Sequence, residues 1–227
     1  IVCYGEILST TILSYFFNQE NIENVWIDSR NLIKTDTTYR DAVVDWTKTE
    51  NNIKNQIQSE KLYITQGFIG SDPNHFSATL GREGSDYSAA IFAYCLDAKS
   101  VTIWKDVPGV LNADPRYFED TTLLNQISYR EAIELAFYGA SVIHPKTLQP
   151  LQKKEIPLYV KSFVNPTLPG TSVSRGAILE PFVPCFIVKK NQLLISISSK
   201  DFSFIMESQV SEIFKWFGEN HIKVNVI

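Results

Sequence analysis

The strongest constraint in the sequence is the stretch Leu80-Gly81-Arg82-Glu83-Gly84-Ser85-Asp86, which is followed at once by the helix-like run 87–98. The two glycines favour a tight turn, and they place the long cationic side chain of Arg82 between them. A turn of this kind leads into the N-terminus of a helix, where free backbone N–H groups and the helix dipole favour an anion. The sequence therefore predicts an anion-binding turn, whose ligand is a phosphate or a substrate carboxylate.

Helical and strand-like segments alternate on both sides of this turn, which favours an α/β domain with a largely parallel sheet. Apolar residues at helical spacing over 6–17 predict a helix, and a capping box at Ser128-Tyr129-Arg130-Glu131 predicts the start of another. The turn-rich residues 71–79 are predicted to form a mobile flap. The polar stretch 36–49 is predicted to lie on the surface. Further helices are predicted at 51–61, 86–98 and after His144, and strands at 1–4, 25–27, 62–65, 100–104 and 157–160.

Two prolines and a glycine within 165–171 mark the best candidate boundary, where we expect a linker or a final hairpin. The predicted domains are residues 1–175 and 190–227. Beyond the boundary, apolar strand-like runs lie at 185–188 and 193–197. An amphipathic helix at 208–219 and a strand at 222–227 complete a β-α-β pattern.

Composition excludes several classes of function. The net charge of −4 is spread along 227 residues without a basic run, so neither nucleic acid nor a membrane surface is an expected partner. No apolar run reaches the roughly 18 residues of a membrane-spanning helix. The three cysteines (Cys3, Cys95 and Cys185) lack C-x-x-C spacing and suit a reducing, cytoplasmic compartment. The chain opens on an apolar run without Met, and we expect that a natural N-terminal portion precedes it.

Polar and charged groups at successive strand ends suit phosphoryl transfer, which requires cations and N–H dipoles around the transferring oxygens and an acceptor held in line. Taken singly these groups also have structural interpretations: a helix start for Glu6, a solvated pair for Lys105 and Asp106, and a turn for 114–116. Neither a P-loop nor a dinucleotide-binding glycine motif is present. No metal site is predicted, because His75 and His144 have no partners at metal-ligand spacing, and Cys95 is predicted to be core.

Taken together, the motifs resemble those of the aspartokinases of the amino acid kinase family, in order and spacing, over nearly the whole chain. The motifs that carry this resemblance are Tyr4-Gly5-Glu6-Ile7-Leu8-Ser9, Thr65-Gln66-Gly67-Phe68-Ile69-Gly70, Thr79 to Tyr87, Trp104-Lys105-Asp106-Val107-Pro108-Gly109-Val110, Ala113-Asp114-Pro115-Arg116, Ile127 to Ala132, Tyr138-Gly139-Ala140, His144-Pro145 and Pro166 to Thr171.

The resemblance implies ATP-dependent phosphorylation of the L-aspartate side-chain carboxylate to 4-phospho-aspartate, the first step of lysine, threonine and methionine biosynthesis. It also implies an open αβα sandwich with a mostly parallel central sheet, and Mg²⁺ brought with the nucleotide. Glu6 would bind the substrate ammonium group and Arg82 a carboxylate. By the same resemblance Arg82 and Asp86 would be catalytic, Phe68, Gly84 and Ser85 would line the substrate pocket, and Lys105, Asp106, Arg116, Ser141 and Val142 would bind the nucleotide.

The chain also departs from the family pattern. The usual Lys-Phe-Gly-Gly phosphate-binding stretch is absent, and Ser141 stands where a lysine is usual. Lys105 occupies a position that is commonly Thr, so we expect it to restore that charge from a neighbouring loop. Leu111 stands where a Tyr often flanks the adenine, and Glu83 replaces a common Gly.

The tail from about 192 resembles the opening of an ACT domain, a module that binds regulatory amino acids, which implies lysine or threonine as effector. The segment 199–202 would contribute to that effector site, although an ordinary strand-to-helix loop explains it equally well. A homo-oligomer is expected. Three alternatives stay open at this point: a non-catalytic amino-acid-binding module, a kinase for another small carboxylate, and the kinase part of a fusion with homoserine dehydrogenase.

Overall fold

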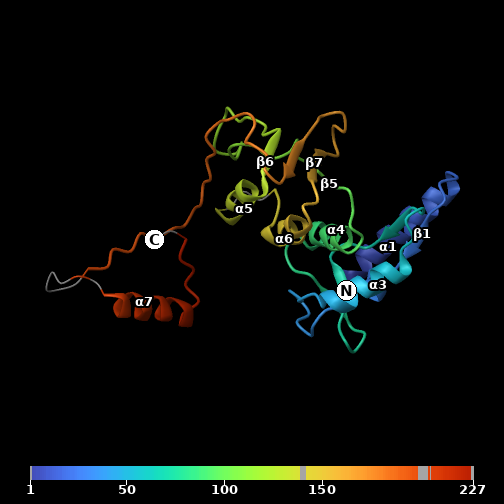
Figure 1. Ribbon diagram of the computed structural model, residues 1–227, viewed down its shortest axis with the longest axis horizontal. Coiled ribbons are helices and arrows are strands. Elements are labelled where there is room, and N and C mark those ends of the chain that lie inside the picture. Colours follow the sequence, from blue (N-terminus) through green and yellow to red (C-terminus); the bar gives the residue numbers. More distant parts are fainter. Residues whose placement is uncertain (1, 139–141, 199–203, 205, 226–227) are drawn as a thin grey trace. The chain divides into compact units, whose positions relative to one another are not determined.

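The computed structural model describes residues 2–138, 142–198, 204 and 206–225 (Figure 1). The chain divides into two compact units, 1–187 and 188–227, which are described separately here. The domain limits expected from the sequence stay a prediction.

The first unit contains six helices and eight strands within the described residues. The helices are α1 (Val2–Gln19), α2 (Ser29–Leu32), α3 (Trp46–Gln56), α4 (Gly84–Cys95), α5 (Tyr129–Tyr138) and α6 (Pro145–Lys154). The strands are β1 (Val25–Ile27), β2 (Tyr63–Thr65), β3 (Ile69–Ser71), β4 (Ser77–Thr79), β5 (Val101–Lys105), β6 (Gln126–Ser128), β7 (Leu158–Ser162) and β8 (Thr171–Ser174).

The strands form three small sheets. β1 pairs with β2 in parallel, and β3 pairs with β4 as an antiparallel hairpin. The third sheet has the order β5-β7-β8-β6, in which β5–β7 and β6–β8 are parallel and β7–β8 is antiparallel. Parallel pairing therefore predominates, which confirms the predicted α/β class, and the proline-rich loop at 165–170 connects the antiparallel pair.

Helix α4 lies between two hydrophobic cores. Its Ala90 and Ala93 belong to the core beneath the four-stranded sheet, whereas Ile91 and Cys95 belong to a second core with residues of α2 and α3. Helices α4, α5 and α6 pack together beside that sheet (Figure 1). Because α4 is buried on both sides, its N-terminus is fixed relative to both cores.

One sequence prediction is wrong in this unit. Residues 2–4 were expected in a buried strand, but they lie in α1, where Val2 and Tyr4 are exposed. A strand needs a neighbouring strand for its backbone hydrogen bonds, whereas a helix forms them within its own segment. The expected flap at 71–79 contains the end of β3 and the whole of β4, which pair as a hairpin, and its mobility stays a prediction. The segment 36–49 was expected to lie on the surface, and this is true of only part of it. Ala42 and Val44 are buried, and α3 begins at Trp46.

Other local predictions are confirmed. The helix at 6–17 and the strands at 25–27, 62–65, 100–104 and 157–160 correspond to α1, β1, β2, β5 and β7 within a few residues. The capping box forms before α5, because Ser128 N–H donates to Glu131 Oε2 at 2.7 Å and Glu131 N–H donates to Ser128 Oγ at 3.2 Å.

The second unit holds α7 (Glu207–Glu219), which confirms the predicted amphipathic helix. The strands expected at 193–197 and 222–227 are not formed over the described residues 193–197 and 222–225. A strand needs a neighbour for its backbone hydrogen bonds, and Leu193 and Leu194 are almost fully exposed. The ACT-like assignment therefore stays a prediction. Among the described helices, none is long and apolar enough to cross a membrane.

Candidate functional site

The centre of the site is the turn that leads into α4, and it is built by close backbone packing. A Cβ on Gly84 would lie 2.6 Å from Phe68 Cδ2 and 3.2 Å from Phe68 Cα. A Cβ on Gly67 would lie 2.9 Å from Ser85 Cα. Glycine at both positions lets the turn after β2 and the turn before α4 touch, which brings Phe68, Gly84 and Ser85 close together.

Hydrogen bonds hold this contact. Phe68 N–H donates to Ser88 Oγ at 2.9 Å, and Ser88 Oγ donates to the Gly84 carbonyl at 2.9 Å. Phe68 itself has a φ of +70°, a left-handed conformation that is uncommon for a bulky residue and is stabilised here by its surroundings. Ser88 was missed in the sequence, where it looked like an ordinary helix residue.

The residue at the N-cap of α4 is Glu83, with a φ of +52°. Glycine adopts this left-handed conformation without strain, which explains why a glycine at this position would fit the backbone. The Oε2 atom of Glu83 is buried and has no hydrogen-bond partner among the described residues.

Lys105, at the end of β5, joins the two predicted halves of the site. Its Nζ lies 2.8 Å from Asp86 Oδ2, in the first turn of α4, and about 19% and 15% of the two side chains are exposed. Asp86 Oδ2 is buried and makes no hydrogen bond of normal geometry within the described chain, so the Lys105 ammonium is its compensating charge. A cation is thereby held at a strand end beside a helix N-terminus.

Arg82 sits on the exposed side of the same turn. Its guanidinium makes no ion pair with any residue that the structure describes, and so it is available to an anionic ligand. The backbone beneath it is fixed from the other side, because Gly81 has a φ of +84° and a Cβ there would collide with the Asp41 carboxylate. Asp41 also forms an ion pair with Lys146 of α6.

Glu6 lies on α1, which contacts β1 and β2. The Glu6 carbonyl accepts a hydrogen bond from Thr10 Oγ1 at 2.8 Å, and Thr10 Oγ1 accepts one from Gln66 Nε2 at 2.9 Å. Gln66 is fully buried and its Oε1 also accepts from Ser29 N–H at 2.8 Å. The turn that carries Phe68 is therefore tied to α1 one helical turn beyond Glu6.

The remaining predicted nucleotide residues do not gather around Lys105 through any described contact. Arg116 pairs with its own neighbour Asp114 at 2.6 Å, and hydrogen bonding from Arg116 lowers the pKa of the Asp114 carboxyl. Asp106 is exposed. Val142 packs against the core beneath the four-stranded sheet, and Ser141 lies outside the described residues.

Two other side chains behave as the sequence predicts. His144 is the N-cap of α6, where its Nδ1 accepts from Lys146 N–H at 3.2 Å, and so its role is structural. Cys95 is completely buried, and burial raises the pKa of its thiol to about 12, so it is a core residue. No cluster of three or more metal-ligating side chains occurs among the residues described.

Sequence reasoning assigned no role to Gln66, Asp41 or Lys146. A signal for Lys146 was present, because a cation in the first turn of a helix opposes the helix dipole unless an acid compensates it. Gln66 also had a signal, as a polar residue directly after an apolar strand. For Asp41 we find none, since only the folding of 36–44 against Gly81 gives it a role.

The family model described as "Amino acid kinase family" matches residues 1–162. The chain belongs to the amino acid kinase family. Lysine-sensitive aspartokinase 3 of Escherichia coli is 33% identical over 232 residues, which cover 100% of this chain and 51% of that protein. The bifunctional aspartokinase/homoserine dehydrogenase of Buchnera aphidicola is 34% identical over 100% of this chain and 28% of its own length.

Among solved structures, that of E. coli aspartokinase III in complex with aspartate and ADP matches with a TM-score of 0.78 and 30% identity. The match covers 100% of this chain and 51% of that one. The chain thus spans about half the length of this family member, and the family's fold agrees with the architecture in Figure 1.

Proposed function

We propose that the protein transfers the γ-phosphoryl group of ATP to the side-chain carboxylate of L-aspartate, giving 4-phospho-aspartate and ADP. A carboxylate oxygen attacks the γ-phosphorus while the bond from that phosphorus to the bridging oxygen of ADP breaks. The observation that carries the proposal is the ion pair between Lys105 and Asp86, which joins the turn before α4 to the end of β5. The similarity to a structure that holds aspartate and ADP supports the same reaction.

On the substrate side, Arg82 would pair with a carboxylate of aspartate and Glu6 with its ammonium group. Phe68, Gly84 and Ser85 would form the wall of the pocket, and the N–H groups at the start of α4 would favour the negative charge of the reacting oxygens. Asp86 would act by holding the Lys105 ammonium in place. The exposed guanidinium of Arg82 and the packed glycine turn support these roles.

On the nucleotide side, Lys105 would contact the polyphosphate, and its charge would replace that of the lysine usual at the position of Ser141. The fit is supported by the Lys105 ammonium, whose sole carboxylate partner among the described residues is Asp86, so part of its hydrogen-bonding capacity remains for phosphate oxygens. Asp106, Arg116 and Val142 would lie further along the nucleotide. Mg²⁺, arriving with ATP, would neutralise charge on the β- and γ-phosphates.

The decisive assay follows ATP consumption by the protein in its full natural length, with L-aspartate as acceptor and hydroxylamine to trap the acyl phosphate. We expect Glu6→Ala and Arg82→Ala each to lower kcat/KM about 10²-fold or more, because each removes a charge that orients the acceptor. Arg130→Ala is the matched control, since Arg130 is exposed on α5 and its ion pair within the described chain is a local one with Glu134. No trapped product from the unaltered protein would favour the alternative of a non-catalytic binding module, and trapping with a different carboxylate alone would change the substrate.

We further propose that an amino acid, lysine or threonine, regulates the protein through the region 190–227, and that the protein works as a homo-oligomer in the cytoplasm. The similarity to the lysine-sensitive aspartokinase 3 of E. coli supports an amino-acid effector. Adding each amino acid to the same assay tests this proposal.

A further inference from the structure

A cavity of about 380 Å³ lies in the first unit, away from the turn before α4. It opens between α3, the segment that follows α2, and the tip of the β3–β4 hairpin. Its volume falls within the range of roughly 300–1,000 Å³ that is typical of small-molecule sites. The polar residues that line it are Lys34, Thr35, Lys48, Asn51, Asn52, Asp72 and His75.

The lining favours an anion. Lys34, Lys48 and His75 come from three different elements. Lys48 Nζ already pairs with Asp45 at 3.2 Å and Asn52 Nδ2 already donates to the Asn31 carbonyl at 3.2 Å, whereas the Asn51 amide supplies a neutral donor. Lys34 Nζ donates to the Arg30 carbonyl at 2.7 Å and to Ser71 Oγ at 3.0 Å, which holds the ammonium and leaves its third proton for a ligand. Within the described chain Lys34 makes no ion pair, so no protein carboxylate neutralises it at contact distance.

The one carboxylate in the lining is already satisfied by the hairpin itself. Asp72 accepts hydrogen bonds from Phe76 N–H at 2.7 Å, from Asn74 N–H at 3.0 Å and from the Tyr39 hydroxyl at 3.2 Å. These donors stabilise the ionised carboxylate, which keeps its negative charge. Because Lys48 pairs with Asp45, the cation of the lining that remains for a negatively charged group is Lys34, with the Asn51 amide beside it in the same lining.

The hairpin connects this cavity to the proposed substrate pocket. Its tip, at 72–76, lines the cavity, whereas its two ends carry Phe68 and the turn with Arg82. Strand β3 is also joined to the cavity wall, because Ser71 N–H donates to the Ile33 carbonyl at 3.0 Å and Thr35 N–H donates to the Ser71 carbonyl at 2.9 Å. A ligand that contacts both α3 and the tip would restrain the whole hairpin.

We propose that this cavity binds a small anion through its phosphate or carboxylate group, and that the bound anion braces the β3–β4 hairpin against α3. The site is separate from the proposed kinase reaction and does not depend on it. Phosphate and carboxylate share the chemistry that the lining recognises, and the experiment distinguishes them.

The test is a titration of the 227-residue chain, followed by the imidazole resonances of its three histidines at one fixed pH. The probes are inorganic phosphate and citrate, with sodium chloride at matched ionic strength as the reference. We expect the His75 resonance to shift in a saturable manner with one of the probes, while those of His144 and His221 stay in place. Amide exchange over 69–79 should slow in the same sample.

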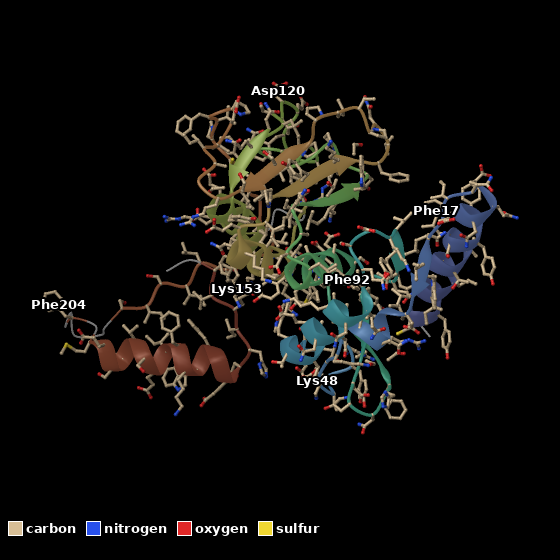
Figure 2. The ribbon with its side chains drawn as sticks, turned by 45° about the vertical axis from the view of Figure 1, so that its right-hand side comes forward. Phe17, Lys48, Phe92, Asp120, Lys153 and Phe204 are labelled. Carbon is tan, nitrogen blue, oxygen red and sulfur yellow. The ribbon has the colours of Figure 1, made fainter. Side chains whose placement is uncertain are left out.

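Two variants make the test specific. Asn51→Asp places a carboxylate in the cavity from an exposed position on α3, and it should weaken binding at least about fivefold. Lys153→Gln makes the same change in net charge, but on α6. Figure 2 shows Lys153 well separated from Lys48, so this variant should leave binding unchanged. A linear drift of all three histidines, an equal effect of sodium chloride, or unaltered affinity in Asn51→Asp would overturn the proposal.

Discussion

Residues 66–88 and residues 105–116, which carry the substrate and nucleotide halves of the proposed site, are held in place by different means. The first region depends on backbone packed against backbone, with Gly67 and Gly84 as the points of contact. The second depends on single side chains with separate local partners, such as Arg116 with Asp114. The first arrangement tolerates little change, whereas the second allows one cation to be replaced by another, as we propose for Lys105.

The rate at which a cysteine thiol is alkylated reports how tightly its surroundings are packed. We expect the largest effect of all in the comparison of Cys95, on α4, with Cys185, near the nucleotide half of the proposed site. Cys95 anchors α4 in a core, and burial raises the pKa of its thiol to about 12. Cys185 is half-buried, and burial also raises the pKa of its thiol. It lies beside residues 105–116, because the N–H of the next residue, Phe186, donates to the Asn112 carbonyl. At pH 8 we expect native Cys95 to alkylate about 10³-fold more slowly than a free cysteine, because so little of it is thiolate.

Mass spectrometry after iodoacetamide treatment measures this. Because both pKa values are raised, both rates should increase as the pH rises through and beyond the ordinary range of a thiol, with Cys185 always ahead of Cys95. Denatured protein, in which all cysteines react alike, is the control. Equal native rates would show that α4 opens as readily as the nucleotide loop.

A methyl group at Gly84 tests the packed region directly. Gly84→Ala favours the helix by propensity, but its Cβ would force Phe68 aside. We expect kcat/KM for aspartate to fall about 10²-fold, since an error of about 1 Å in a reacting geometry has that effect. Gly218→Ala, on α7 with open space around it, is the matched control. Retained activity in Gly84→Ala would mean that close backbone contact does not define the substrate pocket.

Substitutions in residues 105–116, the nucleotide half of the proposed site, should have smaller and unequal effects on the kinetics. Lys105→Ala should raise KM for ATP about tenfold, because it removes a held cation and leaves Asp86 buried without its partner. Arg116→Ala should raise it about threefold at most, because this exposed guanidinium is paired with Asp114. Steady-state kinetics with ATP varied gives both values. Unchanged ATP affinity in Lys105→Ala would refute the idea that Lys105 replaces the missing lysine.

Much of the fold could be predicted because its signals are local. Helical spacing over 6–17, the β-branched run before Lys105 and the capping box at Ser128 each depend on neighbours within a few residues. The errors arose where distant partners decide the outcome. The turn-rich segment 71–79 forms a hairpin because β3 pairs with β4 and with Lys34, and the apolar run 193–197 forms no strand because no described segment pairs with it.

The candidate site shows the same division. The types of residue were visible in the motifs, and so was the glycine turn before α4. Their pairing was not, because nothing in the sequence indicates that Asp86 meets Lys105 rather than a ligand, or that Asp41 lies against Gly81 and pairs with Lys146.

By itself, the sequence determined the α/β class, a helix at 86–98 that corresponds to α4 within a few residues, and the set of charged groups available for phosphoryl transfer. The tertiary structure decided which of those charges meet, where a polar cavity opens beside α3, and that one hairpin connects the cavity to the turn. The physical reason is one of range. Propensity, capping and periodicity act over a few residues along the chain, whereas ion pairs and cavities depend on segments that only packing brings together.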